Sequence, residues 1–372
     1  MKRIRKHLSP RRIVLKVGTR LLSDPRHRLD PKALARVVGE AATARKRGID
    51  VLLVSSGAVG AGMGILGLDL PPSALVERQA CAAIGQGELM HEYARLFRRR
   101  RICVAQILLT RQEMANRRSH QNIRRVLERL LHRGVLPIVN ENDVVAADEL
   151  QLGDNDTLAG LVADMIEADL LVILTDTDGL RMRRDGRWGK RIRVVTVITE
   201  EMRRAAGGAE SKTGTGGMIT KVRVAERMAR AGRPTVIANG GTPNILRKVL
   251  AGEDVGTWFL PSPRRLVARK RWIADGLVPD GKVVVDAGAA EALLKRGSSL
   301  LPKGVVAVEG DFGEGAAVEI VDEAGAVLGQ GLSRYDSRAL ARIRRRDSRE
   351  IESILGYSRG DEVIHRNDLV IG

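Results

Sequence analysis

Residues 211–221 read SKTGTGGMITK, a glycine-rich turn followed by the start of an apolar helical pattern that contains a lysine. Glycines allow positive φ angles and let a ligand approach the backbone, and the N-terminus of a helix presents unpaired N–H groups with a partial positive charge. The apolar spacing from Met218 onward places Gly216 and Gly217 at such an N-terminus, with Lys221 one turn behind. The stretch lacks the P-loop pattern of Gly, four residues, then Gly-Lys-Ser/Thr. It predicts a phosphate-binding turn, with an ordinary surface turn as the alternative.

A second lysine, Lys16, lies near the end of the apolar run at 13–17 and is followed by Gly18. A charged side chain in such a run is costly to bury unless it meets an anionic partner, although a lysine on an edge strand can reach solvent with its ammonium group. If this run is a strand of a parallel sheet, Lys16 and Lys221 meet at the same edge of that sheet. Two ammonium groups at one edge suit a phosphoryl group in transfer.

Two further stretches are dense in carboxylate and amide side chains, PIVNENDVV at 137–145 and LGDNDTLAG at 152–160. Such side chains beside an apolar strand can recognise an amino and a carboxyl group, coordinate Mg²⁺ or orient lysines. A plain turn, with an Asx cap on a helix that begins near Thr157, is the alternative for the second stretch. The candidate residues are Asn140, Glu141, Asn142, Asp143, Asp154, Asn155 and Asp156.

These candidates must be positioned by the elements around them. The first 260 residues alternate short β-branched runs with longer helical patterns, which is typical of a parallel sheet covered by helices. The polar candidates follow the strands directly, and open α/β sheets bind ligands at the carboxyl ends of their strands. The TDTDG stretch at 175–179 is another such exit, although Asp-Gly turns are common. The expected strands are 13–17, 51–55, 102–108, 135–139, 170–174 and 235–238.

The length and composition predict two domains. A chain of 372 residues with 44% hydrophobic content can bury a large core. We expect an α/β fold with an open, mainly parallel sheet sandwiched by helices in residues 1–260, then a linker at 261–280 that contains a surface helix. Residues 281–372 show short strands with glycine turns and then a helical pattern over 337–355, which predicts a small β-barrel or sandwich.

Several classes of protein are excluded by the sequence. No run of 18 or more apolar residues occurs, and no signal-type apolar segment follows the N-terminal stretch MKRIRKHLSPRR, so we expect a cytoplasmic protein. Cys81 and Cys103 lack metal or redox spacing, and the six histidines are scattered. The GxGxxG pattern of Gly62, Gly64 and Gly67 starts well past the strand end and lacks the acidic residue of a second strand, so we reject dinucleotide binding.

The formal charge of +18 raises the question of nucleic acid. Residues 261–372 hold 18 Lys and Arg against 17 Asp and Glu, so the excess lies in the first domain. Much of it is arginine in runs such as 98–101, which usually form solvated faces, and aromatic residues for base stacking make up only 2% of the chain. The bulk charge is therefore weak evidence for RNA, and the RIRRR stretch at 342–346 stays as a local candidate.

The order of the motifs KVGT, SSGAVGAG, NENDVV, GDNDTLAG, LTDTDGL and GTGGMITK resembles the glutamate 5-kinase family of the amino acid kinase superfamily. The resemblance covers nearly the whole chain, since RGSSLLPKG followed by SRY is similar to the C-terminal PUA domain of many bacterial members. It implies that ATP phosphorylates the side-chain carboxylate of L-glutamate, with Mg²⁺, to give L-glutamyl 5-phosphate in the first step of proline biosynthesis. It also implies a homo-oligomer, either a dimer or a tetramer, and proline as a feedback inhibitor.

The resemblance assigns roles to individual residues by motif. Lys16 and Lys221 would contact the phosphates, and Asp154 would organise the two lysines. The residues implied for glutamate are Ser56, Gly57, Asn140, Asp143 and Asn155. The residues implied for the nucleotide are Lys16, Thr175, Asp176, Gly214, Thr215, Gly216, Gly217, Met218 and Lys221. The metal ligands are not assigned.

The chain departs from the family's pattern at two positions near the nucleotide. Arg181 follows Leu180 where the family often has tyrosine, and Lys212 stands in the glycine loop where a small or apolar residue is common. Superfamily kinases that act on aspartate, N-acetylglutamate, carbamate or nucleoside monophosphates are alternatives within the enzyme class. RNA binding by the PUA-like domain is an alternative from another class.

The chemistry of the implied reaction agrees with the residue types. A glutamate side chain with an ordinary pKa near 4.3 is already ionised at pH 7, so the reaction needs no general base. It needs two mutually repelling anions to be held in line and the charge on the phosphoryl group to be neutralised. Asp143 and Asp154 are therefore expected to bind and organise rather than to transfer protons.

Overall fold

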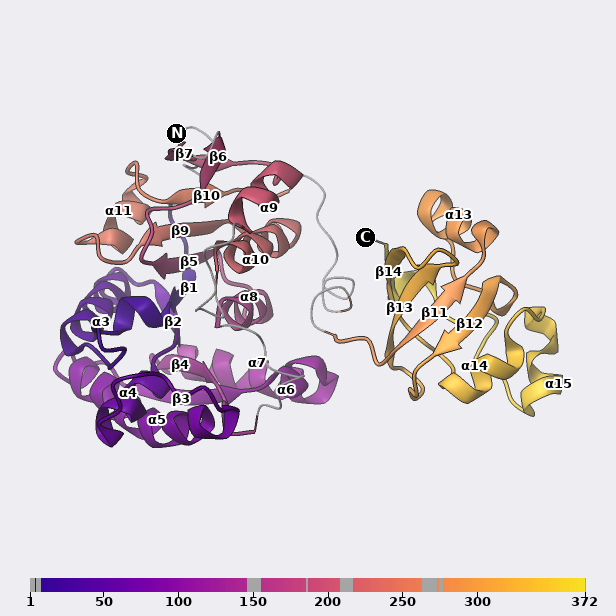
Figure 1. Ribbon diagram of the computed structural model, residues 1–372, viewed down its shortest axis with the longest axis horizontal. Coiled ribbons are helices and arrows are strands. Elements are labelled where there is room, and N and C mark those ends of the chain that lie inside the picture. The colour runs from indigo at the N-terminus through magenta and orange to yellow at the C-terminus, as the bar shows by residue number, and fades with distance from the viewer. Residues whose placement is uncertain are drawn as a thin grey trace. The chain divides into compact units, whose positions relative to one another are not determined.

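The computed structural model describes residues 4, 8–145, 155–184, 187–207, 217–262, 273 and 277–371. The chain divides into two compact units, residues 1–265 and 266–372. The larger unit is built on a large mixed sheet with helices, and the smaller one has a sheet of its own (Figure 1). Much of the expected linker, with its surface helix, lies outside the described residues.

The larger unit contains an eight-stranded sheet in the order β3-β4-β2-β1-β5-β9-β10-β8, in which only β9 and β10 pair antiparallel. β1 (Arg12–Val17) lies between β2 (Asp50–Ser55) and β5 (Leu170–Thr175). The chain passes from β1 to β2 on one side and later returns to β5 on the other side, so β1 marks the point where an open α/β sheet binds its ligands. The other strands are β3 (Val104–Leu109), β4 (Leu136–Glu141), β8 (Val194–Val195), β9 (Thr235–Asn239) and β10 (Thr257–Phe259).

Helices cover both faces of this sheet (Figure 1). Side chains alternate along a strand, so Leu15 packs into the core on one face and Val14 into the core on the other. Burial on both faces explains why the central strands read as continuous aliphatic runs. The helices of the first face are α3 (Pro31–Lys46), α4 (Ala58–Leu66), α5 (Leu75–Arg98) and α11 (Ile245–Ala251), and those of the second are α7 (Arg117–His132), α8 (Asn155–Met165) and α10 (Met218–Arg230). Shorter helices are α2 (Thr19–Leu22), α6 (Arg111–Ala115) and α9 (Glu200–Ala206).

The predicted fold class and the six predicted strands are confirmed, with strand ends that shift by at most two residues. The sequence analysis missed β8 and β10, which are only two and three residues long. It also missed the hairpin of β6 (Arg181–Arg184) and β7 (Arg187–Arg191). Very short or arginine-rich strands show little alternation of apolar and polar residues, so this alternation does not identify them in the sequence.

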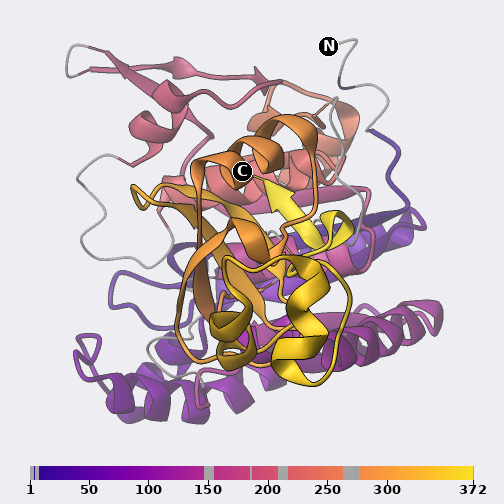
Figure 2. The ribbon, with the colours of Figure 1, turned by 90° about the vertical axis from the view of Figure 1, so that its right-hand side faces the viewer.

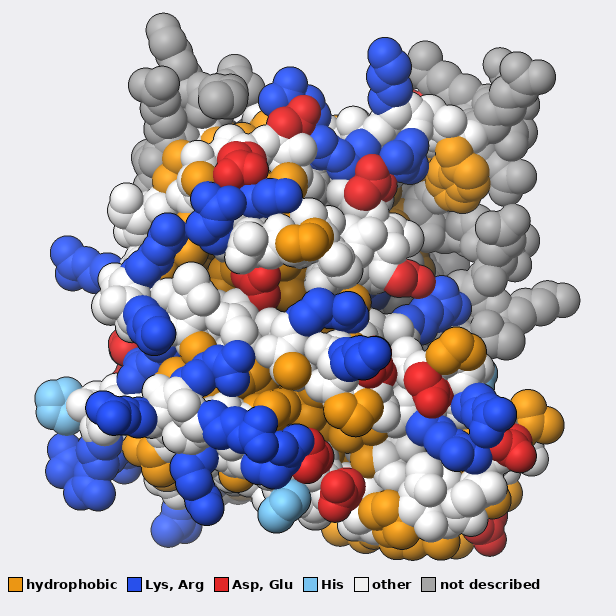
Figure 3. All heavy atoms as spheres, turned by 90° about the vertical axis from the view of Figure 1, so that its left-hand side faces the viewer, with side chains coloured by type: hydrophobic (Ala, Val, Ile, Leu, Met, Phe, Trp, Pro, Cys, Tyr) orange, Lys and Arg blue, Asp and Glu red, His pale blue; other side chains and the backbone are white. Residues whose placement is uncertain are grey.

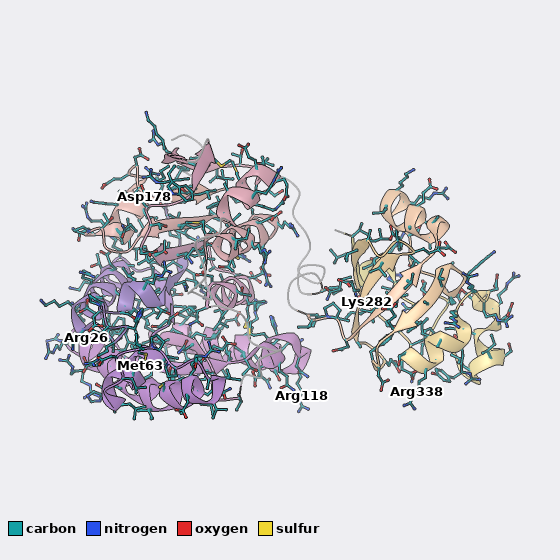
Figure 4. All side chains as sticks on the ribbon, viewed as in Figure 1. Arg26, Met63, Arg118, Asp178, Lys282 and Arg338 are labelled. Atoms are coloured by element: carbon teal, nitrogen blue, oxygen red, sulfur yellow. The ribbon has the colours of Figure 1, made fainter. Side chains whose placement is uncertain are left out.

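The rejected GxGxxG pattern is explained by the packing of α4 on α5. A Cβ atom at Gly62 would overlap the backbone carbonyl of Cys81, and one at Gly85 would overlap the carbonyl of Ala58. Gly67 ends α4 in the left-handed region, with φ of 69°. Met63, labelled in Figure 4, is buried on the same helix. Gly62 and Gly85 therefore serve the close approach of the two helices, and Gly67 serves the end of α4.

The smaller unit contains a five-stranded sheet in the order β12-β11-β13-β14-β15. Helix α13 (Ala287–Arg296) lies at one end of this sheet, and α14 (Ser337–Ile343) and α15 (Ile351–Leu355) lie at the other (Figures 1 and 2). The helical pattern predicted over 337–355 is interrupted, because Arg345 adopts the left-handed region with φ of 61°. The strands are β11 (Gly281–Val285), β12 (Val305–Glu309), β13 (Ala317–Asp322), β14 (Val327–Leu332) and β15 (Leu369–Ile371), the last of which was not predicted.

The surface of the larger unit carries the basic excess. Figure 3 shows Lys and Arg side chains spread over one face of it, with fewer Asp and Glu side chains between them. Cys81 and Cys103 are free thiols. Within the described residues, no helix is long and apolar enough to cross a membrane, and no group of three or more His, Cys, Asp or Glu side chains could hold a metal ion.

Candidate active site

Two lysines and one aspartate meet at the carboxyl edge of the central strands. Lys16 lies near the end of β1, Asp156 in the first turn of α8 and Lys221 in the first turn of α10. Nζ of Lys16 is 2.7 Å from Oδ1 of Asp156, and Nζ of Lys221 is 2.8 Å from Oδ2. The side chains are almost inaccessible to solvent, with exposed fractions of 4% for Lys16, 0% for Asp156 and 7% for Lys221. We call these three residues the lysine–aspartate triad.

The triad is electrostatically suited to an anionic ligand. Burial disfavours ionisation of Asp156, but the two lysines outweigh it and hold the pKa of this carboxyl below its ordinary value. Asp156 is therefore a carboxylate at neutral pH and a poor candidate for a proton carrier. The formal charges of the three side chains sum to +1, so the triad complements negative charge on a ligand at the sheet edge.

Glycines keep space and backbone available beside the triad. A Cβ atom at Gly18 would lie 3.5 Å from Nζ of Lys16, so the absence of a side chain leaves room next to the ammonium group. Gly217 is the N-cap of the 13-residue helix α10, as the glycine-rich stretch predicted. The N-terminus of such a helix favours anions. Both glycines are thus placed where phosphate oxygens could approach.

Asn155, which precedes Asp156 in the sequence, lies in a cluster of amide and hydroxyl groups. Nδ2 of Asn155 shares its two hydrogens among three acceptors, the backbone oxygen of Ser55 at 3.1 Å, Oγ of Ser56 at 2.8 Å and Oδ1 of Asn140 at 2.9 Å. These groups lie at the carboxyl ends of β2 and β4 and at the start of α8. Open α/β sheets bind their ligands at this edge. Oδ1 of Asn155 is buried and has no hydrogen-bond partner among the described residues. This oxygen is an acceptor suited to a ligand that donates.

Asp143 and Gly57, which are also expected at the acceptor side, follow the ends of β4 and β2. Asp143 follows β4 in a turn, where burial raises the pKa of its carboxyl and the charge of Arg78 partly opposes the shift. Gly57 follows Ser56 and caps α4 in the left-handed region, with φ of 111°. A residue with a Cβ atom would be strained at this angle, so glycine is what lets the chain turn from β2 into α4.

The expected nucleotide loop leaves the end of β5. Oγ1 of Thr175 donates to Oδ1 of Asp176 at 2.9 Å, and Arg20 pairs with the other carboxylate oxygen at 3.4 Å. Burial opposes ionisation of Asp176, but the bonds from Thr175, the backbone and Arg20 keep its pKa below the ordinary value. Gly240 donates its N–H to the backbone oxygen of Thr175 at 2.9 Å, which ties the loop to the end of β9.

Arg181, the departure from the family's pattern, is engaged within the protein. Its guanidinium binds both oxygens of Asp178, at 3.1 and 2.8 Å, and donates to the backbone oxygen of Gly189 at 3.0 Å. Asp178 is labelled in Figure 4, at the base of the β6–β7 hairpin. The arginine therefore fastens the hairpin to the TDTDG loop. Lys212, the second departure, lies outside the described residues.

Four of the expected site residues, Asp154, Gly214, Thr215 and Gly216, also lie outside the described residues, so their roles stay predictions. Among the described residues, the carboxylate that bridges both lysines is Asp156, to which the sequence analysis gave no role of its own. Asp156 shares a face of α8 with Gly160 and Ala163, and this spacing of four and seven residues was the signal that could have found it. Gln86 and Tyr93 of α5, which hydrogen-bond Asn140 and Ser55, were also missed, and they carried no such signal.

The fold and the site define an α/β domain with a buried lysine–aspartate triad at the end of its central strands. Comparison with known proteins agrees, because the model of the "Amino acid kinase family" matches residues 11–239 and that of the "PUA domain" matches residues 281–355. A protein of Moorella thermoacetica named glutamate 5-kinase is 47% identical over 363 residues, covering 97% of this chain and 96% of its own length. Proteins of the same name from Geobacter sulfurreducens and Caldanaerobacter subterraneus are 46% and 45% identical, with 97% of each chain covered.

The chain belongs to the amino acid kinase family and carries a PUA domain. The resemblance inferred from its motifs is thereby confirmed, and so is its expected class, a kinase.

Proposed function

We propose that this chain transfers the γ-phosphoryl group of ATP to the side-chain carboxylate of L-glutamate, forming L-glutamyl 5-phosphate in the first step of proline biosynthesis. The observation that carries the proposal is the buried lysine–aspartate triad next to the amide cluster of Asn155. The relatives, whose name states the same activity, support it over nearly their whole length.

The proposed acceptor side consists of Ser56, Gly57, Asn140, Asp143 and Asn155. An amino acid offers an ammonium group, which needs anionic or carbonyl acceptors. Oδ1 of Asn155, which has no partner among the described residues, and the carboxylate of Asp143 are such acceptors. Amide and hydroxyl donors at the same edge suit the carboxylates of the substrate.

The proposed donor side consists of Lys16 and Lys221 with Thr175, Asp176, Gly217 and Met218, together with Gly214, Thr215 and Gly216. The two ammonium groups would bind the phosphate oxygens and neutralise the charge that spreads over them in the transition state. Asp156 pairs with both buried lysines and so holds their ammonium groups in place. Its lowered pKa keeps Asp156 ionised during the reaction. Asp154 stays in the proposal as a second organising carboxylate.

The side chains near the triad fit Mg²⁺ as an ion that arrives with the nucleotide. Both oxygens of Asp156 pair with lysines, so another carboxylate has to hold the ion. Mg²⁺ is often held by one or two carboxylates plus substrate phosphates. Asp176, whose side chain is 44% exposed, is the described carboxylate that would hold it at the nucleotide loop. When bound, the ion supplies further neutralisation of phosphate charge.

Further parts of the proposal come from the family resemblance. We propose a cytoplasmic protein with a kinase domain in residues 1–260, a linker at 261–280 and a PUA-like domain in residues 281–372, and with proline as an inhibitor. We also propose a homo-oligomer, because large apolar side chains are exposed on α5 and on the edge strand β3, with Val76 71% exposed. Light scattering of the purified protein tests the oligomer, and a proline titration of the activity tests the inhibition.

RNA binding by the second unit has less support. The basic stretch 342–346 is followed directly by acidic residues, and Arg346 lies 4.0 Å from Glu350 while Arg349 pairs with Asp347 at 2.9 Å. The charge in this region is therefore mixed, which argues against strong binding to a phosphate backbone. A salt-dependent gel shift with the full chain tests this alternative.

The proposed reaction is tested by incubating the purified protein with MgATP, L-glutamate and hydroxylamine, which traps an acyl phosphate as its hydroxamate. Glutamate-dependent formation of both hydroxamate and ADP is the expected result. A panel of aspartate, N-acetylglutamate, carbamate and UMP separates the other activities of the superfamily. ADP release only with one of these acceptors, and no hydroxamate with glutamate, would overturn the proposed substrate.

A further inference from the structure

The amide cluster of the candidate site is held by two side chains of one helix. Nδ2 of Asn140 donates to Oε1 of Gln86 on α5 at 2.9 Å. Two turns further along α5, the hydroxyl of Tyr93 lies 2.7 Å from Oγ of Ser55. The backbone oxygen of Ser55 in turn accepts from Asn155. The hydrogen bonds thus form one connected network that starts and ends on α5.

The backbone carbonyl of Ser55 fixes the direction of the amides in this network. A carbonyl oxygen only accepts, so Asn155 must turn its amide nitrogen toward Ser55. The same nitrogen faces Asn140, which must present Oδ1 and so turns its own nitrogen toward Gln86. Gln86 completes the series by presenting Oε1. The carbonyl oxygen of Asn155 is thereby directed away from the protein acceptors that bind its nitrogen.

The Tyr93 end of the network is equally directional. Oγ of Ser55 donates to the backbone oxygen of Ser56 at 3.0 Å, so the hydroxyl of Tyr93 is the donor in its contact with Ser55. Burial raises the pKa of Tyr93, which keeps this hydroxyl protonated. The backbone at Ser55 and Ser56 is therefore held by a fully buried donor.

Helix α5 is anchored firmly enough to serve as the reference for these groups. Tyr93 and Phe97 are fully buried, and their rings stack with centroids 6.2 Å apart. Gly85, next to Gln86, lies so close to α4 that a Cβ atom there would overlap the backbone of Ala58. The helix cannot shift without disturbing the core, so Gln86 and Tyr93 hold fixed positions.

We propose that Gln86 and Tyr93 are positioning residues that orient the amides of Asn140 and Asn155, so that the carbonyl oxygen of Asn155 is presented to the ammonium group of the acceptor substrate. The proposal rests on the proposed function, because it assigns that ammonium group to glutamate. Neither residue is placed to touch the reacting atoms in this scheme. Their effect is therefore expected on recognition of the amino acid rather than on phosphoryl transfer.

The first test is Gln86→Leu in the full chain, with initial rates of ADP release measured over a range of glutamate and of ATP. Loss of the acceptor leaves Nδ2 of Asn140 without its partner and weakens the hold of Asn140 on Asn155, so we expect a rise of roughly tenfold in the KM for glutamate. The KM for ATP and the thermal midpoint should stay near those of the wild type. Gln86→Glu keeps an acceptor for Asn140 and should recover most of the affinity. Gln106→Leu, at an exposed glutamine of β3, is the matched control.

The second test uses substrates that differ only in the amino group. Glutarate has both carboxylates of glutamate but no ammonium, so its inhibition constant should be nearly unchanged in Gln86→Leu. Tyr93→Phe should raise the KM for glutamate in the same way. Tyr335→Phe, which removes a buried hydroxyl that donates to Gly360 in the smaller unit, should have no effect on this KM.

The outcomes separate this inference from the proposed function. If the wild type forms no ADP with glutamate, the proposed function fails and the inference fails with it. If the wild type is active but Gln86→Leu has an unchanged KM for glutamate, only the inference is overturned. Equal weakening of glutamate and glutarate would also overturn it, because it would indicate a loss of pocket shape rather than of amide direction.

Discussion

Replacing Asp156 by asparagine tests whether the lysine–aspartate triad works through charge. The substitution keeps the size of the side chain but leaves two buried ammonium groups without their shared carboxylate. Each contact, at 2.7 and 2.8 Å, is worth about 6 kcal/mol of Coulomb energy at an effective dielectric constant of about 20. Desolvation offsets most of this. Removing one partner of a buried ion pair typically lowers the free energy of unfolding by about 3–5 kcal/mol, and we expect a loss of this size.

The assay combines unfolding with catalysis. Urea unfolding gives the free energy of unfolding of the larger unit. Its transition is identified as the one that MgATP shifts to higher urea concentration. Initial rates of ADP release should show a fall in kcat of about 10²- to 10³-fold, as for the loss of one preorganised electrostatic group. Asp69→Asn is the matched control, because Asp69 pairs with Arg28 at 2.9 Å but its side chain is 74% exposed. Its effect on stability should stay below about 1 kcal/mol.

A triple variant, K16M/D156L/K221M, separates stability from function. Well-packed apolar residues often replace a buried charge cluster without loss of stability, so this variant should be more stable than D156N. It should nevertheless be inactive, because no ammonium groups are left for the phosphates. A D156N protein with wild-type stability and a normal kcat would refute the electrostatic reasoning. A triple variant that retains activity would refute the role of the lysines.

Acid provides an independent check on the sign of this interaction. The pKa of Asp156 is lower in the folded chain than its ordinary value of 3.8, so the unfolded chain binds its proton more readily. The stabilisation is therefore complete above pH 3.8 and disappears as the pH falls through the folded-state pKa. The wild type should lose stability in this window, and D156N should lack that contribution.

Other predictions concern single residues of the site. K221A should lower kcat strongly while the KM for glutamate changes little, and a normal kcat would refute its role in phosphoryl transfer. Because burial raises the pKa of Asp143, the KM for glutamate should rise on acidification at a pH above the ordinary range of aspartate; this dependence should be absent in D143N, and a persistent one would assign it to another group. G18A should weaken ATP binding without affecting thermal stability, because the added Cβ atom would lie 3.5 Å from Nζ of Lys16; unchanged nucleotide binding would mean that the phosphates lie elsewhere.

The strands and the location of the site could be predicted because both follow from local patterns. Aliphatic runs such as 13–17 are long enough to identify a strand buried on both faces. Once the sheet is parallel, the polar residues at the ends of those strands must share one edge. Lys16, Lys221 and Asn155 are therefore brought together by a rule that applies to the whole fold class rather than by a motif alone.

The choice between the acidic residues of GDND required knowledge of where the helix begins. The sequence analysis placed a helix near Thr157, whereas α8 begins at Asn155. That earlier start puts Asp156 in the first turn, on the buried face of the helix. The contacts of Gln86 and Tyr93 were beyond prediction for a different reason: they join residues 54 and 38 positions apart, and their geometry depends on how α5 packs against the sheet.

Asn155 and Asp156 are consecutive residues at the start of one helix, and each belongs to a different half of the site. Asn155 binds the amides and hydroxyls at the ends of β2 and β4, while Asp156 binds the two lysines. A rigid helical turn therefore fixes the separation between the proposed acceptor pocket and the proposed phosphate site. A reaction between two anions needs its reactants held close and in line more than it needs a proton carrier. Placing both sets of contacts on adjacent residues of α8 meets this requirement without relying on a mobile loop.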